Sequence, residues 1–237
     1  MSQTIPLLWL PGLLCNNQLF QPVNQHLKGV EPVCAELTAQ NSMQELARTI
    51  LEQAPESFIL GGLSMGGILA FEVYRQAPKR VKGLILLDTN SADEFALPEV
   101  TAKRNLLVDK AINGQFSSIT PDSLMPVLIH IDRLKDTELT QTICQMAENI
   151  GVERFVNHAQ ALASRPDARP LLGDIVVPTV VICGREDALC PVTNHLLILE
   201  KIPNASLHVL PNCGHLSTLE KPTEVAGLIN GWLKNQF

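Results

Sequence analysis

Short apolar runs alternate along the chain with longer segments of mixed polarity. The runs have the length of strands and are almost continuously apolar, which is typical of parallel strands buried on both faces. They are residues 5–10, 30–35, 57–61, 81–87, 178–183 and 206–210. The alternation predicts an α/β fold with a mostly parallel, doubly wound sheet.

Amphipathic segments of helix length follow most of these runs. The clearest start is Ser42, a good N-cap residue, because Glu45 three positions later completes a capping box. The predicted helices of this core are residues 17–27, 42–54, 64–77, 192–202 and 223–234. His195 falls in the fourth of these helices and is expected on its surface.

The stretch 91–172 breaks the alternation. It contains helix-like segments at 100–112, 121–134 and 137–163 but no convincing strand. We interpret it as a helical cap inserted between two strands of the sheet. The predicted α/β core then consists of residues 1–90 and 173–237.

Composition and charge exclude several classes of protein. The 237 residues are 46% hydrophobic and carry a net charge of −6, which favours a globular domain over a basic nucleic-acid binder. The chain has no apolar run of about 18 residues, so no membrane span is expected. The first residues lack a basic region, and Pro6 and Pro11 interrupt their apolar run, so we expect no signal peptide.

The six cysteines form neither a CxxC pair nor a cluster with zinc spacing. We expect reduced thiols, a cytoplasmic location and no metal site. Cys15 and Cys190 are interpreted as small apolar fillers, with Cys15 as an alternative nucleophile.

The motif Gly62-Leu63-Ser64-Met65-Gly66 lies directly between a predicted strand and a predicted helix. A nucleophile elbow requires this context, because its serine stands on a sharp turn above the sheet. The flanking glycines remove side chains that would clash with that turn. A glycine-rich connection without a chemical role is the alternative interpretation of the motif. Ser64 is therefore the predicted nucleophile.

A serine needs a base, and the base needs an acid that orients it. His215 follows the strand 206–210 in a loop with Gly214, at the strand end where such sheets bind ligands. Asp187 follows the strand 178–183 and is the predicted acid. Glu186 and Asp88 are its rivals, although Asp88 is expected to cap a turn through the amides that follow it.

The developing oxyanion needs backbone N–H donors. We predict that the amides of Met65, directly after the serine, and Leu13, in the loop after the first strand, supply them. Leu14 is the second choice for the loop donor. Leu189 and Leu216 adjoin the acid and base segments and are predicted to line the substrate pocket.

These pieces resemble the α/β-hydrolase superfamily of serine hydrolases, and the short chain and Arg165-Pro166-Asp167 resemble its small carboxylesterases. The resemblance rests on LPGLL, GLSMGG, LLDTN, CGREDALCP and NCGHLSTLEKP, in this order along the chain. It implies a Ser-His-Asp triad in the order Ser64, Asp187, His215, a helical cap and no cofactor. Pro11 stands where many members of the superfamily have a histidine.

The expected function is that of a serine hydrolase that cleaves a small-molecule ester or related acyl compound through an acyl-enzyme. One alternative is a C–C bond hydrolase or lyase with the same triad, and another is a non-catalytic receptor for a small ligand. The expected partner is a small-molecule substrate, with neither nucleic acid nor membrane, and the expected state is a monomer or homodimer.

Overall fold

The computed structural model describes residues 4–93 and 98–237. Residues 1–3 of the predicted core and 94–97 of the predicted cap lie outside this range. A six-stranded sheet in the order β2-β1-β3-β4-β5-β6 forms the centre, and every neighbouring pair is parallel. Its strands are β1 (Ile5–Leu10), β2 (Val30–Cys34), β3 (Phe58–Leu63), β4 (Val81–Leu87), β5 (Thr179–Gly184) and β6 (Ala205–Leu210). The predicted fold class is confirmed.

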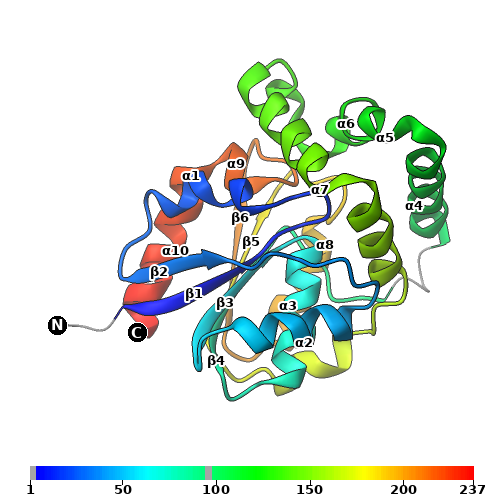
Figure 1. Cartoon of the computed structure of the whole chain (residues 1–237). Coiled ribbons are helices and arrows are strands. Elements are labelled where there is room, and N and C mark those ends of the chain that lie inside the picture. Colours follow the sequence, from blue (N-terminus) through cyan, green and yellow to red (C-terminus); the bar gives the residue numbers. More distant parts are fainter. Residues whose placement is uncertain (1–3, 94–97) are drawn as a thin grey trace.

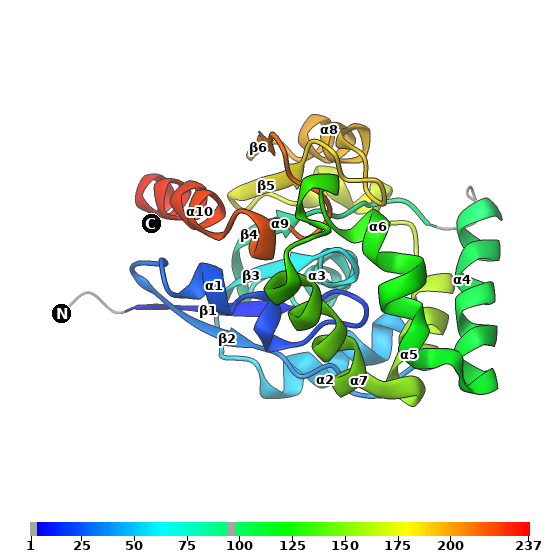
Figure 2. The ribbon, with the colours of Figure 1, turned by 90° about the horizontal axis from the view of Figure 1, so that it is seen from above.

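Helices cover both faces of the sheet (Figures 1 and 2). Alternate residues of β1 show this directly, because Leu8 and Leu10 pack in one buried cluster while Leu7 and Trp9 pack in another. The first cluster also holds residues of α2 (Met43–Gln53), α3 (Met65–Gln76) and α8 (Val192–Lys201). The second holds residues of α1 (Gln21–Asn24), α9 (Ser217–Glu220) and α10 (Pro222–Gln236).

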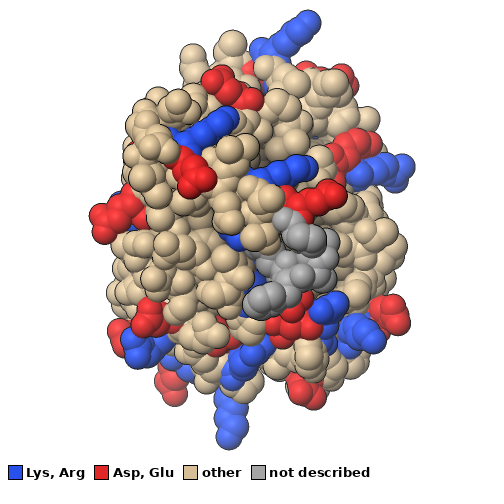
Figure 3. Space-filling view, turned by 90° about the vertical axis from the view of Figure 1, so that its right-hand side faces the viewer, with Lys and Arg blue, Asp and Glu red and all other residues tan. Residues whose placement is uncertain are grey.

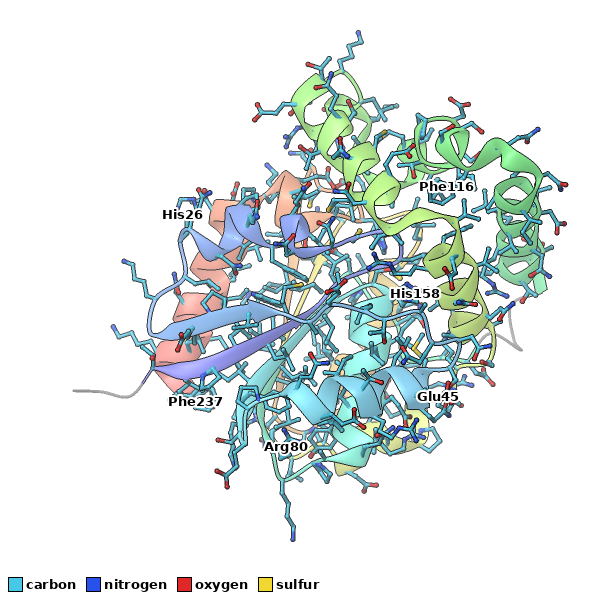
Figure 4. All side chains as sticks on the ribbon, in the orientation of Figure 1. His26, Glu45, Arg80, Phe116, His158 and Phe237 are labelled. Atoms are coloured by element: carbon cyan, nitrogen blue, oxygen red, sulfur yellow. The ribbon has the colours of Figure 1, made fainter. Side chains whose placement is uncertain are left out.

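Further helices lie over the carboxyl ends of the strands, at the upper right of Figure 1. They are α4 (Pro98–Lys110), α5 (Phe116–Ser118), α6 (Met125–Leu128) and α7 (Thr137–Ala163). His158 on α7, labelled in Figure 4, donates from Nε2 to the carbonyl of Thr38 at 2.8 Å. This bond ties α7 to the chain that follows β2.

Three predicted helices are interrupted, one of them 137–163, where Gly151 has a φ of +76° and a ψ of 172°. The segment 17–27 divides into a short turn, η1 (Asn17–Leu19), and α1, because the side chain of Asn16 caps the first and Pro22 begins the second. The segment 121–134 divides because Ile129 is extended, at φ −130° and ψ 160°. The extended backbone there makes hydrogen bonds to another part of the chain, which a continuous helix could not make.

The division into core and cap stays a prediction, but the packing near its second boundary is clear. Ala161 at the end of α7, with Ala168 and Leu172 beyond it, is buried in the same cluster as β1 and α3. The last residues of the predicted cap therefore contribute to the core. In the part of the chain that the structure describes, no helix is both long enough and apolar enough to span a bilayer.

The cap of α2 tests the local part of this fold. Ser42 Oγ accepts a hydrogen bond from the amide of Glu45 at 3.2 Å, as the sequence predicts. Ser42→Ala removes this acceptor and should lower the free energy of unfolding by about 1 kcal/mol. Urea unfolding measures the change, and Ser42→Asp, which retains an acceptor, is the control. Equal stability of the alanine variant and the wild type would contradict the capping role.

Candidate functional site

Ser64 sits at the carboxyl end of β3, on a backbone turn that few serines adopt. Its φ is +54° and its ψ is −116°, and the helix α3 begins at the next residue. Leu14, Asp88 and Asn212 also have positive φ, and they follow β1, β4 and β6. Strained backbone of this kind gathers at functional sites, where the surrounding structure holds it in place. The carboxyl edge of the sheet is therefore the candidate site.

The glycines around Ser64 permit this turn, as expected. A Cβ atom on Gly62 would lie 2.2 Å from the carbonyl oxygen of Gly66, and one on Gly66 would lie 1.9 Å from that of Leu10. Real Cβ atoms do not approach backbone so closely, so both positions require glycine. The close contact of Gly66 with Leu10 also places the start of α3 directly on the end of β1.

His215 and Asp187 form the predicted pair. The Nδ1 atom of His215 donates to Oδ2 of Asp187 at 2.8 Å, and both side chains are buried. The other carboxylate oxygen of Asp187 accepts from the amides of Leu189 and Cys190, each at 2.8 Å. The carboxylate is therefore held by its own loop, and the bond to Nδ1 leaves the Nε2 atom of neutral His215 with its lone pair.

Asp88 and Thr89, at the end of β4, connect the serine segment with the histidine segment. Asp88 Oδ1 accepts from the amide of Gly184 at 2.9 Å, and Oδ2 accepts from the amide and hydroxyl of Ser217. The Thr89 hydroxyl donates to the carbonyl of Ser64 at 2.7 Å. Two adjacent residues thus bind the segments that carry the serine, the acid and the base.

These contacts correct the sequence analysis on two residues. Asp88 does not cap a turn through the amides of Thr89 or Asn90, because its carboxylate points across the sheet to Gly184 and Ser217. His195 was expected on a helix surface, yet it is fully buried, and its Nε2 accepts from the amide of Thr89 at 2.9 Å. Both partners are more than 90 residues away along the chain, so no local pattern reveals them.

Burial shifts the titration of these groups. Burial, followed by the nearby charge of Asp187, raises the pKa of Asp88 to about 8. Burial alone would lower the pKa of His215, but the charge of Asp187 and the hydrogen bond to it outweigh burial, so the net shift is upward. Burial lowers the pKa of His195 to about 4, which keeps its imidazole neutral as the acceptor for Thr89.

The loop after β1 closes over the serine turn. A Cβ atom on Gly12 would lie 3.5 Å from Cβ of Ser64. The amide of Cys15 donates to the carbonyl of Gly12 at 3.1 Å, so Leu13 and Leu14 are the central residues of a tight turn. Met65 is the first residue of α3, where backbone N–H groups lack partners within the helix. Both predicted oxyanion donors therefore belong to segments adjacent to Ser64.

The two predicted pocket residues differ in exposure. The side chain of Leu189 is 44% exposed, whereas Leu216 is buried in the cluster that contains Trp9. Their role in lining a substrate pocket stays a prediction. A cavity of about 400 Å³ lies beside the loop after β1, and Pro11, Cys34 and Arg154 are among the residues that line it. None of the predicted site residues lines that cavity.

The arginines of the cap bind groups of the protein. Arg154 pairs with Glu36, Arg169 pairs with Asp167, and Arg133 pairs with Asp136. Arg165 is buried and donates to the carbonyls of Ala92 and Leu162. On the face shown in Figure 3, acidic and basic side chains are interspersed over the surface.

One group of buried residues in the described part of the chain has donor atoms close enough for a metal ion, namely Asp187, Cys190 and His215. Asp187 and His215 already use their facing atoms to bond each other. Burial raises the pKa of the Cys190 thiol and that of Cys15, the latter to about 12. Since the thiolate is both the metal ligand and the nucleophile, these thiols suit neither role, and the group fits a proton-transfer pair better.

Comparisons with known proteins identify the family of the chain. A family model described as the alpha/beta hydrolase fold matches residues 39–222. The chain is 30% identical over 183 residues to 2-hydroxy-6-oxononadienedioate/2-hydroxy-6-oxononatrienedioate hydrolase 2 of Pseudomonas putida, covering 73% of this chain and 62% of that protein. The chain thus spans about three fifths of that relative's length.

Two further proteins are similar over more of their length. A pimeloyl-acyl-carrier-protein methyl ester esterase of Aromatoleum aromaticum is 22% identical over 213 residues, covering 79% of this chain and 78% of that protein. The structure of a thermophilic esterase from Thermogutta terrifontis superposes with a TM-score of 0.83 at 24% identity, covering 99% of this chain and 91% of that one. At this identity the superposition establishes the fold alone.

The raised pKa of Asp88 has a consequence for stability. A carboxyl whose pKa is higher in the folded state favours folding when protonated, and this contribution is lost as pH rises from about 4 to about 8. Asp88→Asn stays neutral, so the stability of the wild type relative to this variant should fall across that window. Urea unfolding at several pH values measures the difference. Asp122→Asn, at an exposed position, is the control. A constant difference between wild type and Asp88→Asn would rule out the shift.

Proposed function

We propose a hydrolytic reaction for this chain, which belongs to the α/β-hydrolase fold family. The proposed function is hydrolysis of a small-molecule ester or related acyl compound by Ser64, His215 and Asp187. The observation that carries it is the buried bond between His215 and Asp187, at the same sheet edge as a serine on a strained strand-to-helix turn. A residue in that conformation is expected where the serine hydroxyl must be presented to a substrate.

In the first half of the reaction, the Ser64 hydroxyl oxygen attacks the carbonyl carbon of the substrate. Nε2 of His215 accepts the hydroxyl proton, and Asp187 stabilises the resulting imidazolium. The carbonyl oxygen becomes an oxyanion, which accepts hydrogen bonds from the amides of Met65 and Leu13. Collapse of this intermediate transfers the proton from His215 to the leaving alcohol and leaves an acyl group on Ser64.

In the second half, water replaces the alcohol. His215 removes a proton from the water, whose oxygen attacks the acyl carbon and forms a second tetrahedral intermediate. Its collapse returns the proton to Ser64 and releases the carboxylic acid. Because the same donors bind both oxyanions, their positions on two rigid segments serve both halves of the reaction.

A second candidate is hydrolysis of a C–C bond next to a ketone. It is favoured by the 30% identity to the Pseudomonas putida hydrolase, whose name describes a 2-hydroxy-6-oxo acid as substrate. The same base and oxyanion donors serve this reaction, with a carbanion equivalent as the leaving group in place of an alkoxide. A substrate panel of esters, thioesters, lactones and a 2-hydroxy-6-oxo dienoic acid distinguishes the two.

We further propose a small-molecule partner and a cytoplasmic location. The six free cysteines support a reducing compartment, and the mixed charges of Figure 3 offer no support for a polyanionic partner. Measurement of the mass in solution distinguishes a monomer from a homodimer. Turnover of an activated ester distinguishes an enzyme from a non-catalytic receptor.

Covalent labelling tests the nucleophile. A fluorophosphonate should modify one serine at stoichiometric loading, and peptide mapping should locate the label on Ser64. Ser64→Ala should abolish both labelling and turnover while the protein remains folded, because the serine side chain contributes little packing. A stoichiometric label on another serine would refute the assignment.

Matched substitutions test the acid. Asp187→Asn removes the acceptor that orients His215, and comparable losses in a serine protease are about 10⁴ in kcat, so we expect a loss of at least about 10³ here. Asp88→Asn should lose less than about tenfold, because its amide oxygen can still accept from Gly184 and its NH₂ group can donate to the Ser217 hydroxyl, so the links to both segments remain. The measurement is kcat on one good ester. The opposite order of losses would identify Asp88 as the acid.

A further inference from the structure

The loop that carries His215 is hydrogen-bonded to the helical cap. The amides of His215 and Leu216 both donate to the carbonyl of Leu128, at 3.0 Å and 3.1 Å. Leu128 ends α6, and the chain from there to Arg133 lies against the histidine loop. A Cβ atom on Gly214 would lie 2.7 Å from the backbone nitrogen of His130, so the two backbones are in direct contact.

The carboxylate of Glu220 also joins the histidine loop to the cap. One oxygen of its carboxylate accepts from the amide of Gly214 at 2.9 Å, and the other accepts from the amide of His130 at 2.7 Å. Its backbone carbonyl accepts from Nη1 of Arg133 at 2.9 Å. The side chain is buried, with 4% of the residue exposed. A single carboxylate therefore joins the residue before His215 to the cap.

The same carboxylate acts on His215 electrostatically. Among the charges that raise the pKa of His215, Glu220 follows Asp187 and Asp88. Glu220 is buried, where water screens charges poorly, so its negative charge stabilises the protonated imidazole of His215. Neither effect involves contact with substrate, since the groups that Glu220 binds are backbone amides and an arginine.

We propose that Glu220 is a positioning residue for His215, and that it places the base correctly by locking the histidine loop to residues 128–133 of the cap. This inference rests on the proposed function of His215. The cap segment and His215 therefore take up their positions together, because the same carboxylate holds both. The cap then contributes to the rate of the reaction in addition to enclosing the substrate.

The requirement for a carboxylate follows from the donors around it. Each oxygen of Glu220 faces a backbone N–H, so both terminal atoms must be acceptors. A glutamine presents only one acceptor, and its NH₂ group would face an N–H of Gly214 or His130. A buried donor opposed to another donor is unfavourable, so one of the two segments should move away.

Glu220→Gln is the first test. We expect kcat on an ester to fall about 10- to 100-fold, since small displacements of a catalytic group cost this much, with KM little changed. The ionisation in the kcat/KM profile should move to lower pH, because loss of the negative charge lowers the pKa of His215. Glu224→Gln, an exposed position on the same part of the chain, should match the wild type.

The second test removes the cap donor alone. His130 has a φ of −59°, and Ile129 before it is extended, so proline fits the backbone at position 130. His130→Pro deletes the N–H that Glu220 accepts, whereas His130→Ala removes the imidazole and retains the N–H. We expect the proline variant to be slower than the alanine variant by at least about tenfold.

An NMR titration of the His215 ring distinguishes a failure of this inference from a failure of the proposed function. The ring pKa should fall in Glu220→Gln whether or not Ser64 reacts with an ester. Labelling of the wild type at a serine other than Ser64 would refute the proposed function. An active wild type with unchanged kcat, His215 titration and pH profile in Glu220→Gln would overturn the positioning role. Equal rates for the proline and alanine variants would overturn the part assigned to the cap.

Discussion

The buried carboxylate of Asp88 is the interaction on which the geometry of the site depends. It accepts hydrogen bonds from the segment that leads to Asp187 and from the residue two positions after His215. Its neighbour Thr89 holds the carbonyl of Ser64, and His195 holds the amide of Thr89. A buried polar network is stable only when its members are satisfied, so each of these segments constrains the others. Strained backbone at Ser64 and Asp88 persists because this network holds it.

The site is built from two kinds of support. The sheet supplies the serine, the acid and the base from the ends of β3, β5 and β6, whose spacing is set by backbone pairing. The cap supplies hydrogen bonds to the backbone of the histidine loop through Leu128 and His130. The first support is rigid because its hydrogen bonds repeat along each strand. The second depends on a few bonds between segments that are distant in sequence.

Esterase and C–C hydrolase activities use the same groups in this arrangement. Both of these proposed reactions need a base, which we assign to His215, and donors for an oxyanion, and they differ in the leaving group. The relatives reflect this, because a 2-hydroxy-6-oxo acid hydrolase and a methyl ester esterase both align with the chain. The choice of substrate therefore does not follow from the triad and depends on the residues around it.

The sequence by itself determined the sheet, most of its helices and the residues that we propose for the reaction. Strand bounds such as Val81–Leu87 and the helix Met43–Gln53 agree with the pattern, because apolar periodicity is a local property. Only the tertiary structure decided how the site is held. The partners of Asp88, the burial of His195 and the contact of Glu220 with His130 each join residues about 90 or more positions apart. Such contacts leave no periodic signal, since they arise only when the strand ends and the cap are brought to one edge of the sheet.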